Sequence, residues 1–220
     1  MHLPTHRTRL VRGAVIAGLA IILLVAMALN TTVMTREEAA AMAPTPFDPA
    51  KTGADLLKRA ETDLTYRPLA EVVAGIHSDV AGTAGRMGAI KPFDTTYIFP
   101  VSFEGQVSEV APTSATVTVA QVPPQTRVQV ATGTAVNGAP ARDALGYKFS
   151  DAPGQTEYQY VSDEIKKLVQ QRLSQAATDP GQLQGKTIRV RGMLSVPGAS
   201  NTVPVAKPLI VQVVALEVVR

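Results

Sequence analysis

The stretch VSFEGQVSEVAPTSATVTVA, residues 101–120, decides the fold through the spacing of its apolar side chains. Apolar residues or glycine fall at every second position over 101–107, and valine alternates with threonine over 116–119. A period of two is typical of a half-buried β-strand. The intervening Ala-Pro-Thr-Ser at 111–114 has the composition of a turn. These residues therefore predict a β-hairpin.

Three more strands and a helix are predicted on the C-terminal side of this hairpin. Short runs rich in β-branched residues predict strands at Arg127–Val130, Lys186–Leu194 and Leu209–Val219. A helix is predicted from about Thr156 to Ala176, because apolar residues recur there every three or four positions. The last strand is apolar on both faces, so we expect one face to meet the interior of the sheet and the other to be covered by a helix or a partner.

The order of these elements, three strands, one helix and two strands, matches a small β-barrel of the OB type. Gly105 and Gly192 fall inside predicted strands, where a strongly coiled sheet needs bends. The sequence therefore predicts an α+β fold with an OB-like β-barrel domain over 91–220 and an intervening helix.

A helical segment is predicted over 49–90, before the barrel domain. Its first helix carries a short apolar stripe, and its second carries a longer one at the same helical spacing. Gly82 and Gly85 are expected to end the second helix. The stripe residues are Leu56, Leu57 and Ala60 on the first helix, and Leu69, Val72, Val73, Ile76 and Val80 on the second.

The run from Gly13 to Leu29 contains only apolar residues and glycine, and basic residues precede it. It lies at the lower limit of length for a bilayer span, so the sequence predicts a single-pass transmembrane signal anchor over 13–29 in the bacterial inner membrane. A cleaved signal peptide is the alternative, and Ala26-Met27-Ala28 offers the small residues that signal peptidase requires. A buried core helix is disfavoured because the run has no polar face. The C-terminal domain is expected in the periplasm.

The charge of the chain is concentrated at its N-terminus. The formal charge of +3 comes from 21 basic and 18 acidic residues, and Arg7, Arg9 and Arg12 account for the excess. These arginines form a predicted cytoplasmic basic tail over 1–12, and residues 30–48 predict a linker. The remainder is charge-balanced, so we expect no nucleic-acid partner. The absence of cysteine excludes disulfides, thiolate catalysis and zinc–thiolate sites.

The polar run GTAVNGAPARDALGYKFS, residues 133–150, is the predicted binding surface. Its Gly, Asn and Pro residues favour exposed turns. Arg142 and Asp143 place a planar donor beside an acceptor, which suits a pair of sugar hydroxyls or a partner's carboxylate. An internal ion pair that pins the loop is the alternative. The candidate ligand- or partner-binding residues are Gly133, Thr134, Asn137, Arg142, Asp143 and Gln155.

Catalytic and metal chemistry find little support in the sequence. His77 is the one histidine outside the basic tail, so a metal site or a serine triad would depend on it alone. None of Ser114, Ser150 and Ser195 lies in a GxSxG motif. No phosphate-cradling glycine loop is present either. We therefore expect no catalytic residues, no metal and no cofactor.

The 133–150 run, followed by Gln155-Thr-Glu-Tyr158, resembles a bacterial family of predicted periplasmic lipoproteins, domain of unknown function 2291. Phe47-Asp48-Pro49 and Gly185-Lys-Thr-Ile-Arg-Val-Arg-Gly192 fit the same family. The most specific part is Gly133-Thr134 with Arg142-Asp143-Ala144. Members of that family are often encoded beside ribose-type sugar ABC transporters, and the resemblance implies an accessory role in solute uptake. The sequence departs from the lipoprotein pattern because it lacks a cysteine to carry the lipid.

Three functional hypotheses follow. The first is a membrane-anchored periplasmic accessory or binding module of unknown ligand, attached to the inner membrane through residues 13–29 and working with ABC transporter components or a small solute. The second is an enzyme acting on an envelope saccharide or small solute, and the third is a purely structural envelope protein. An enzyme requires a cleft with convergent titratable groups, whereas an adaptor requires an exposed contact surface.

Overall fold

A computed structural model describes residues 6–31, 34–35 and 46–219. The chain divides into two compact units, Met1–Pro46 and Phe47–Arg220. The first unit contains helix α1 (His6–Asn30). Among the described residues, no helix has both the length and the apolar character that a membrane span needs. The segment predicted as a transmembrane anchor is therefore helical, but its role as a span is not supported.

Parts of two other predicted segments lie outside the described residues. These are residues 1–5 of the basic tail, and residues 32–33 and 36–45 of the linker.

The second unit is a mixed α+β structure in which five strands pair in a complete cycle. β3 (Thr96–Ala111) pairs antiparallel with both β4 (Ser114–Val119) and β6 (Thr187–Pro197). β5 (Val128–Ala131) pairs antiparallel with β4 and parallel with β7 (Leu209–Val219), and β7 pairs antiparallel with β6. We call these five strands the closed sheet. Two short strands, β1 (Arg67–Pro68) and β2 (Ile90–Phe93), pair with β3.

The five strands predicted from the sequence correspond to β3, β4, β5, β6 and β7. Gly105 and Gly192 lie where neighbouring strands approach closely. A Cβ atom on Gly105 would stand 2.5 Å from the carbonyl oxygen of Thr118, and one on Gly192 would stand 2.5 Å from that of Gln212. Both contacts are shorter than a carbon atom tolerates, so the tight coiling of the sheet requires glycine at these positions.

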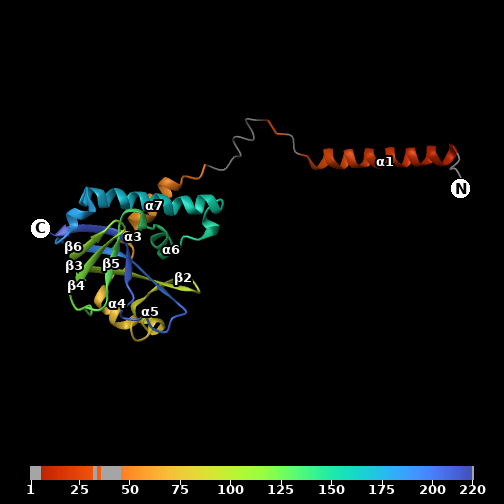
Figure 1. Cartoon of the computed structure of the whole chain (residues 1–220). Coiled ribbons are helices and arrows are strands. Elements are labelled where there is room, and N and C mark those ends of the chain that lie inside the picture. Colours follow the sequence, from red (N-terminus) through yellow and green to blue (C-terminus); the bar gives the residue numbers. More distant parts are fainter. Residues whose placement is uncertain (1–5, 32–33, 36–45, 220) are drawn as a thin grey trace. The chain divides into compact units, whose positions relative to one another are not determined.

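Helices cover the two ends of the closed sheet (Figure 1). α3 (Pro49–Thr62) and α7 (Gln155–Ala176) lie side by side at one end, and α4 (Leu69–Ile76) and α5 (Val80–Met87) lie at the other. α3 approaches α7 closely at Gly53, where a Cβ atom would lie 3.2 Å from the carbonyl oxygen of Val161. The apolar stripes of the helices and the inward side chains of the strands form one core.

The second predicted helix of the 49–90 segment is wrong as a single element. It is broken between Ile76 and Val80 into α4 and α5, because the Asp79 carboxylate accepts a hydrogen bond of 2.9 Å from the Gly82 nitrogen and caps a new helix. α5 continues through Gly82 and Gly85, and it ends at Gly88, which adopts φ of 69°.

Candidate functional site

The predicted binding run, residues 133–150, folds into three short helical pieces. They are η1 (Gly133–Ala135), α6 (Ala139–Ala144) and η2 (Phe149–Asp151). Asn137 forms a local turn, because its side-chain oxygen accepts a hydrogen bond of 2.9 Å from the Ala139 nitrogen. Gly133 adopts φ of 53° and lies against Pro112, whose carbonyl oxygen would be 2.6 Å from an added Cβ. The run therefore packs closely against its neighbours at several points.

Arg142 and Asp143 form a buried ion pair, with exposed fractions of 4% and 9%. Arg142 Nε donates to Asp143 Oδ1 at 2.8 Å, and Arg142 Nη1 donates to the Ser162 hydroxyl at 2.6 Å and to the Tyr158 carbonyl at 3.1 Å. The guanidinium carbon lies 3.6 Å from the centre of the Tyr158 ring, whose hydroxyl donates to Asp143 Oδ1 at 3.2 Å. These internal partners fasten α6 to α7.

The six sequence-predicted site residues do not converge on one cavity. Gln155 is exposed at the first turn of α7, Arg142 bonds to residue 162 of that helix, and the carbonyl of Gly133 accepts a hydrogen bond of 2.7 Å from Gln170. Residues 155 and 170 stand about 22 Å apart along the helix axis at the usual rise per residue. Thr134, next to Gly133, is exposed, and so is Asn137, whose neighbour Gly138 lies against residues 162–166 of α7. The set is therefore a strip along α7.

A small cavity of about 180 Å³ lies at the Gln170 end of this strip, beside Gly133. Thr132, which lines it, is only 3% exposed, and its hydroxyl oxygen has no hydrogen-bond partner within the described residues. The backbone of Thr132 is paired, with its nitrogen donating to the Thr113 carbonyl at 3.0 Å.

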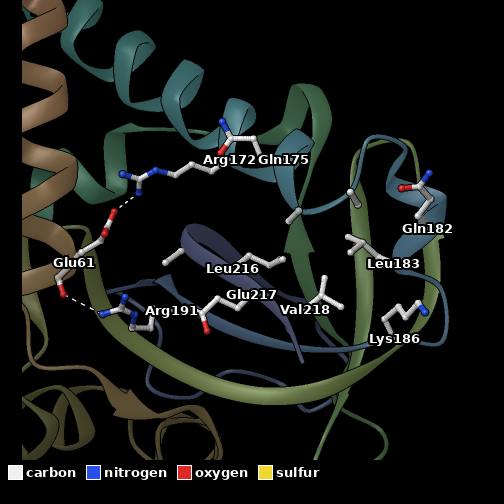
Figure 2. Close-up of a pocket in the computed structure, with 13 residues that line it drawn as sticks. Glu61, Arg172, Gln175, Gln182, Leu183, Lys186, Arg191, Leu216, Glu217 and Val218 are labelled. Atoms are coloured by element: carbon white, nitrogen blue, oxygen red, sulfur yellow. Dashed lines mark hydrogen bonds and ion pairs between the residues drawn. The ribbon is translucent and has the colours of Figure 1, made fainter. Parts of the chain in front are cut away.

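A second concave site is a groove between the C-terminal ends of α3, α7 and β7, with a volume of about 770 Å³. We call it the β7 groove. Figure 2 shows Leu216, Glu217 and Val218 along β7, with Arg172 of α7 on one side and Lys186 on another. Its lining residues are Glu61, Arg172, Gln175, Ala176, Ala177, Gln182, Leu183, Lys186, Arg191, Ala215, Leu216, Glu217 and Val218.

Positive charge in the β7 groove exceeds the negative charge available to balance it. Glu61 of α3 forms an ion pair with Arg172 of α7, and Glu217 lies 3.7 Å from Arg189, which stands outside the groove. Both carboxylates of the groove therefore already face a guanidinium.

Lys186 and Arg191 are the two groove cations without a carboxylate partner among the described residues. Arg191 Nη1 donates a hydrogen bond of 3.1 Å to the carbonyl oxygen of Glu61, and its guanidinium lies 5.7 Å from the centre of the Tyr66 ring. The Lys186 ammonium makes no contact of this kind and is exposed. Burial raises the pKa of Tyr66 to about 12, with Glu61 adding to the rise and Arg191 opposing it. Tyr66 thus places a neutral ring beside the Arg191 guanidinium.

The sequence contained a signal for this groove that the interpretation did not use. Gly185-Lys-Thr-Ile-Arg-Val-Arg places Lys186 at the start and Arg191 near the middle of a predicted strand, but a basic residue in a strand does not by itself indicate a groove. Glu61 and Arg172 are ordinary exposed-face residues of two helices. Their meeting depends on the packing of α3 against α7, which no local pattern encodes.

His77 has a structural position. Its Nδ1 lies 2.7 Å from the carbonyl oxygen of Val203, and its Nε2 lies 3.0 Å from the Thr126 hydroxyl, so the ring joins two distant loops. Within residues 6–31, 34–35 and 46–219, no group of three or more His, Cys, Asp or Glu residues is placed to hold a metal ion.

The fold has a counterpart among solved structures. An OB-fold protein from Thermotoga maritima superimposes with a TM-score of 0.60 at 15% sequence identity, covering 79% of this chain and 99% of that one. At this identity the likeness concerns the fold alone. No curated protein matches the sequence. A family model described as "Predicted periplasmic lipoprotein (DUF2291)" matches residues 19–212, and the chain therefore belongs to this family of predicted periplasmic lipoproteins.

Proposed function

We propose that the chain is a non-catalytic binding module of the periplasm and that the β7 groove receives an anionic ligand or partner group. The observation that carries the proposal is the pair of groove cations, Lys186 and Arg191, that no carboxylate neutralises in the part of the chain the structure describes. An unneutralised cation pair in a concave site favours carboxylate or phosphate groups.

The size and lining of the groove support a binding role. Its volume of about 770 Å³ lies within the range usual for ligand sites. Its polar groups come from α3, α7, β6 and β7 and from the turn before β6, where the backbone of Lys186 bonds to Leu183 and Val107, so the backbone positions of the cations are fixed by the scaffold. The family's description supports an envelope location.

An accessory role beside a sugar ABC transporter is part of the same proposal. It derives from the family resemblance noted above, and the exposed residues Thr134, Asn137 and Gln155 remain candidates for the contact with a transporter subunit. The 220 residues contain no cysteine, so this sequence does not supply the thiol that carries the lipid in lipoproteins. Co-purification from native membranes, with and without crosslinking, tests the association.

Anion binding is tested by nuclear magnetic resonance titration of the whole chain with tri-glutamate, glucuronate and tri-lysine. We expect both acidic probes to shift amide signals of groove residues, and tri-lysine to leave them unchanged. Lys186→Glu should weaken the shifts, whereas Lys207→Glu, which changes the net charge equally at an exposed lysine outside the groove, should not. Equal shifts with tri-lysine, or no shift with either acid, would refute the proposal.

A further inference from the structure

β7 has a strand partner along most of its length on one side only. On that side it pairs with β6 from Val211 to Val219. On the other side it pairs with β5 only through Leu209, Ile210 and Val211. No strand among the described residues lies against that second side over 212–219. We call this part of the strand the free edge of β7.

The free edge begins where β5 turns away from β7. β5 ends at Ala131, and the chain then enters η1. Next to the last paired residue, the Gln212 side chain bonds to the segment that follows β5: its oxygen accepts a hydrogen bond of 2.8 Å from the Asn137 nitrogen, and its nitrogen donates to the Ala135 carbonyl at 3.3 Å. The seam between the two strands therefore ends at Gln212.

The β7 groove runs along this free edge. Ala215, Leu216, Glu217 and Val218 all line it, and four consecutive residues of a strand alternate between its two faces. A cavity that touches both faces borders the edge between them. Leu216 and Val218 are only half-buried, although their cross-strand partners Val190 and Ile188 are fully buried. The carbonyl oxygen of Val214 already accepts a hydrogen bond of 3.3 Å from Arg172 Nη1. The stretch 215–219 therefore combines half-exposed apolar side chains with backbone groups that have no second strand partner among the described residues.

We propose that the free edge of β7 binds an extended peptide segment that carries carboxylate groups, which adds to the sheet as a further strand. The inference rests on the proposed function and specifies its ligand. Unpaired backbone donors and acceptors at a sheet edge bind another strand through main-chain hydrogen bonds. Leu216 and Val218 offer apolar contact to alternate side chains of that strand, and Lys186 and Arg191 attract its carboxylates.

Charge selects this occupant over a second copy of the chain. Two copies joined edge to edge would bring Lys186 and Arg191 of each into the same region, and both lack carboxylate partners within the described residues. Like charges opposed in this way destabilise an interface. An acidic segment from another protein instead supplies the missing counter-charges.

The test uses the whole chain and three synthetic peptides of one length. The first alternates valine with glutamate, the second carries lysine in place of glutamate, and the third repeats the first with every backbone nitrogen methylated. We expect the first peptide to bind and to slow hydrogen exchange of alternate β7 amides over 215–219 about tenfold or more, because these amides gain partners. The lysine peptide and the methylated peptide should leave exchange unchanged.

Variants locate the effect in the groove. Lys186→Glu should weaken binding of the acidic peptide about fivefold, the size of a partly screened ion contact, and Lys207→Glu should leave it unchanged. If the methylated peptide binds as well as its parent, or if β7 exchange stays fast at saturation, strand addition is refuted while anion binding by the groove stands. If only a dimer of the chain protects β7, the second-copy alternative is correct and the proposal is refuted.

Discussion

Replacing Arg142 with alanine should destabilise the folded unit by about 3 to 5 kcal/mol, the cost of removing one member of a buried ion pair. The substitution leaves the Asp143 carboxylate, 9% exposed, without the donor that lies 2.8 Å from it. It also removes the bonds from Arg142 to Ser162 and to the Tyr158 carbonyl, and the stacking on the Tyr158 ring at 3.6 Å. The unpaired charge dominates this sum, because a buried hydrogen bond alone is worth only about 1 kcal/mol.

Urea unfolding of the whole chain, followed by circular dichroism, measures this loss of stability. In thermal unfolding, a fall of about 10 °C in Tm is expected for a unit of this size. The double variant Arg142→Met with Asp143→Asn removes both charges, so it should recover at least half of the lost stability. A loss below about 1 kcal/mol for Arg142→Ala would refute the conclusion that the pair fastens α6 to α7. Arg142 would then be free to serve a ligand.

Three further predictions concern single positions. Gly138→Ala should lower the free energy of unfolding by more than about 2 kcal/mol, because a Cβ there would lie 2.1 Å from the Ser162 carbonyl oxygen. Gly85→Ala, where nothing lies within 4 Å of the added Cβ, should be neutral or stabilising by about 0.5 kcal/mol. Urea unfolding of both variants compares them, and equal effects would contradict the packing argument. Thr132→Val should hold or raise Tm, since the hydroxyl it removes has no partner among the described residues, and a fall of several degrees would mean that the hydroxyl is bonded. The pKa of Tyr66 in the folded protein, about 12, exceeds its ordinary value near 10, so the free energy of unfolding should fall as pH rises from 10 to 12. Tyr66→Phe should flatten this pH dependence in unfolding curves, and an unchanged slope would assign the dependence to another group.

The closed sheet was predictable because most of its strands have one buried face. Val101, Phe103 and Val107 are buried on β3, and the polar residues between them are more exposed, so a period of two identified the strand. The first five residues of β3, 96–100, were missed for a physical reason. Ile98, Phe99 and Pro100 are all buried, and α4 and α5 pack against β3, so burial does not alternate there.

The break between α4 and α5 had a local signal in the sequence, but the contacts around the break come from residues far away along the chain. Asp79 followed by Gly82 is compatible with a helix start, but the stripe from Leu69 to Val80 favoured one continuous helix. The contacts of His77 with Val203 and Thr126 join segments far apart in the sequence. Only the tertiary structure supplies them.

The candidate site was less predictable than the fold. The run at 133–150 was selected because its turns and its Arg142-Asp143 pair resemble a recognition loop, yet both side chains of the pair have internal partners. The β7 groove consists of residues that are unremarkable in isolation, such as Lys186 and Leu216. It exists because β5 leaves β7 early, and strand pairing that ends early is a property of three-dimensional geometry.

Gln212 therefore has an influence out of proportion to its single amide group. Its side chain bonds to the backbone of Ala135 and Asn137 at the point where β5 and β7 stop pairing. Replacing Gln212 with valine would remove both hydrogen bonds and leave β5 and β7 free to pair further. The pairing of β5 with β7 thus ends beside a side chain that lies outside the lining of the β7 groove.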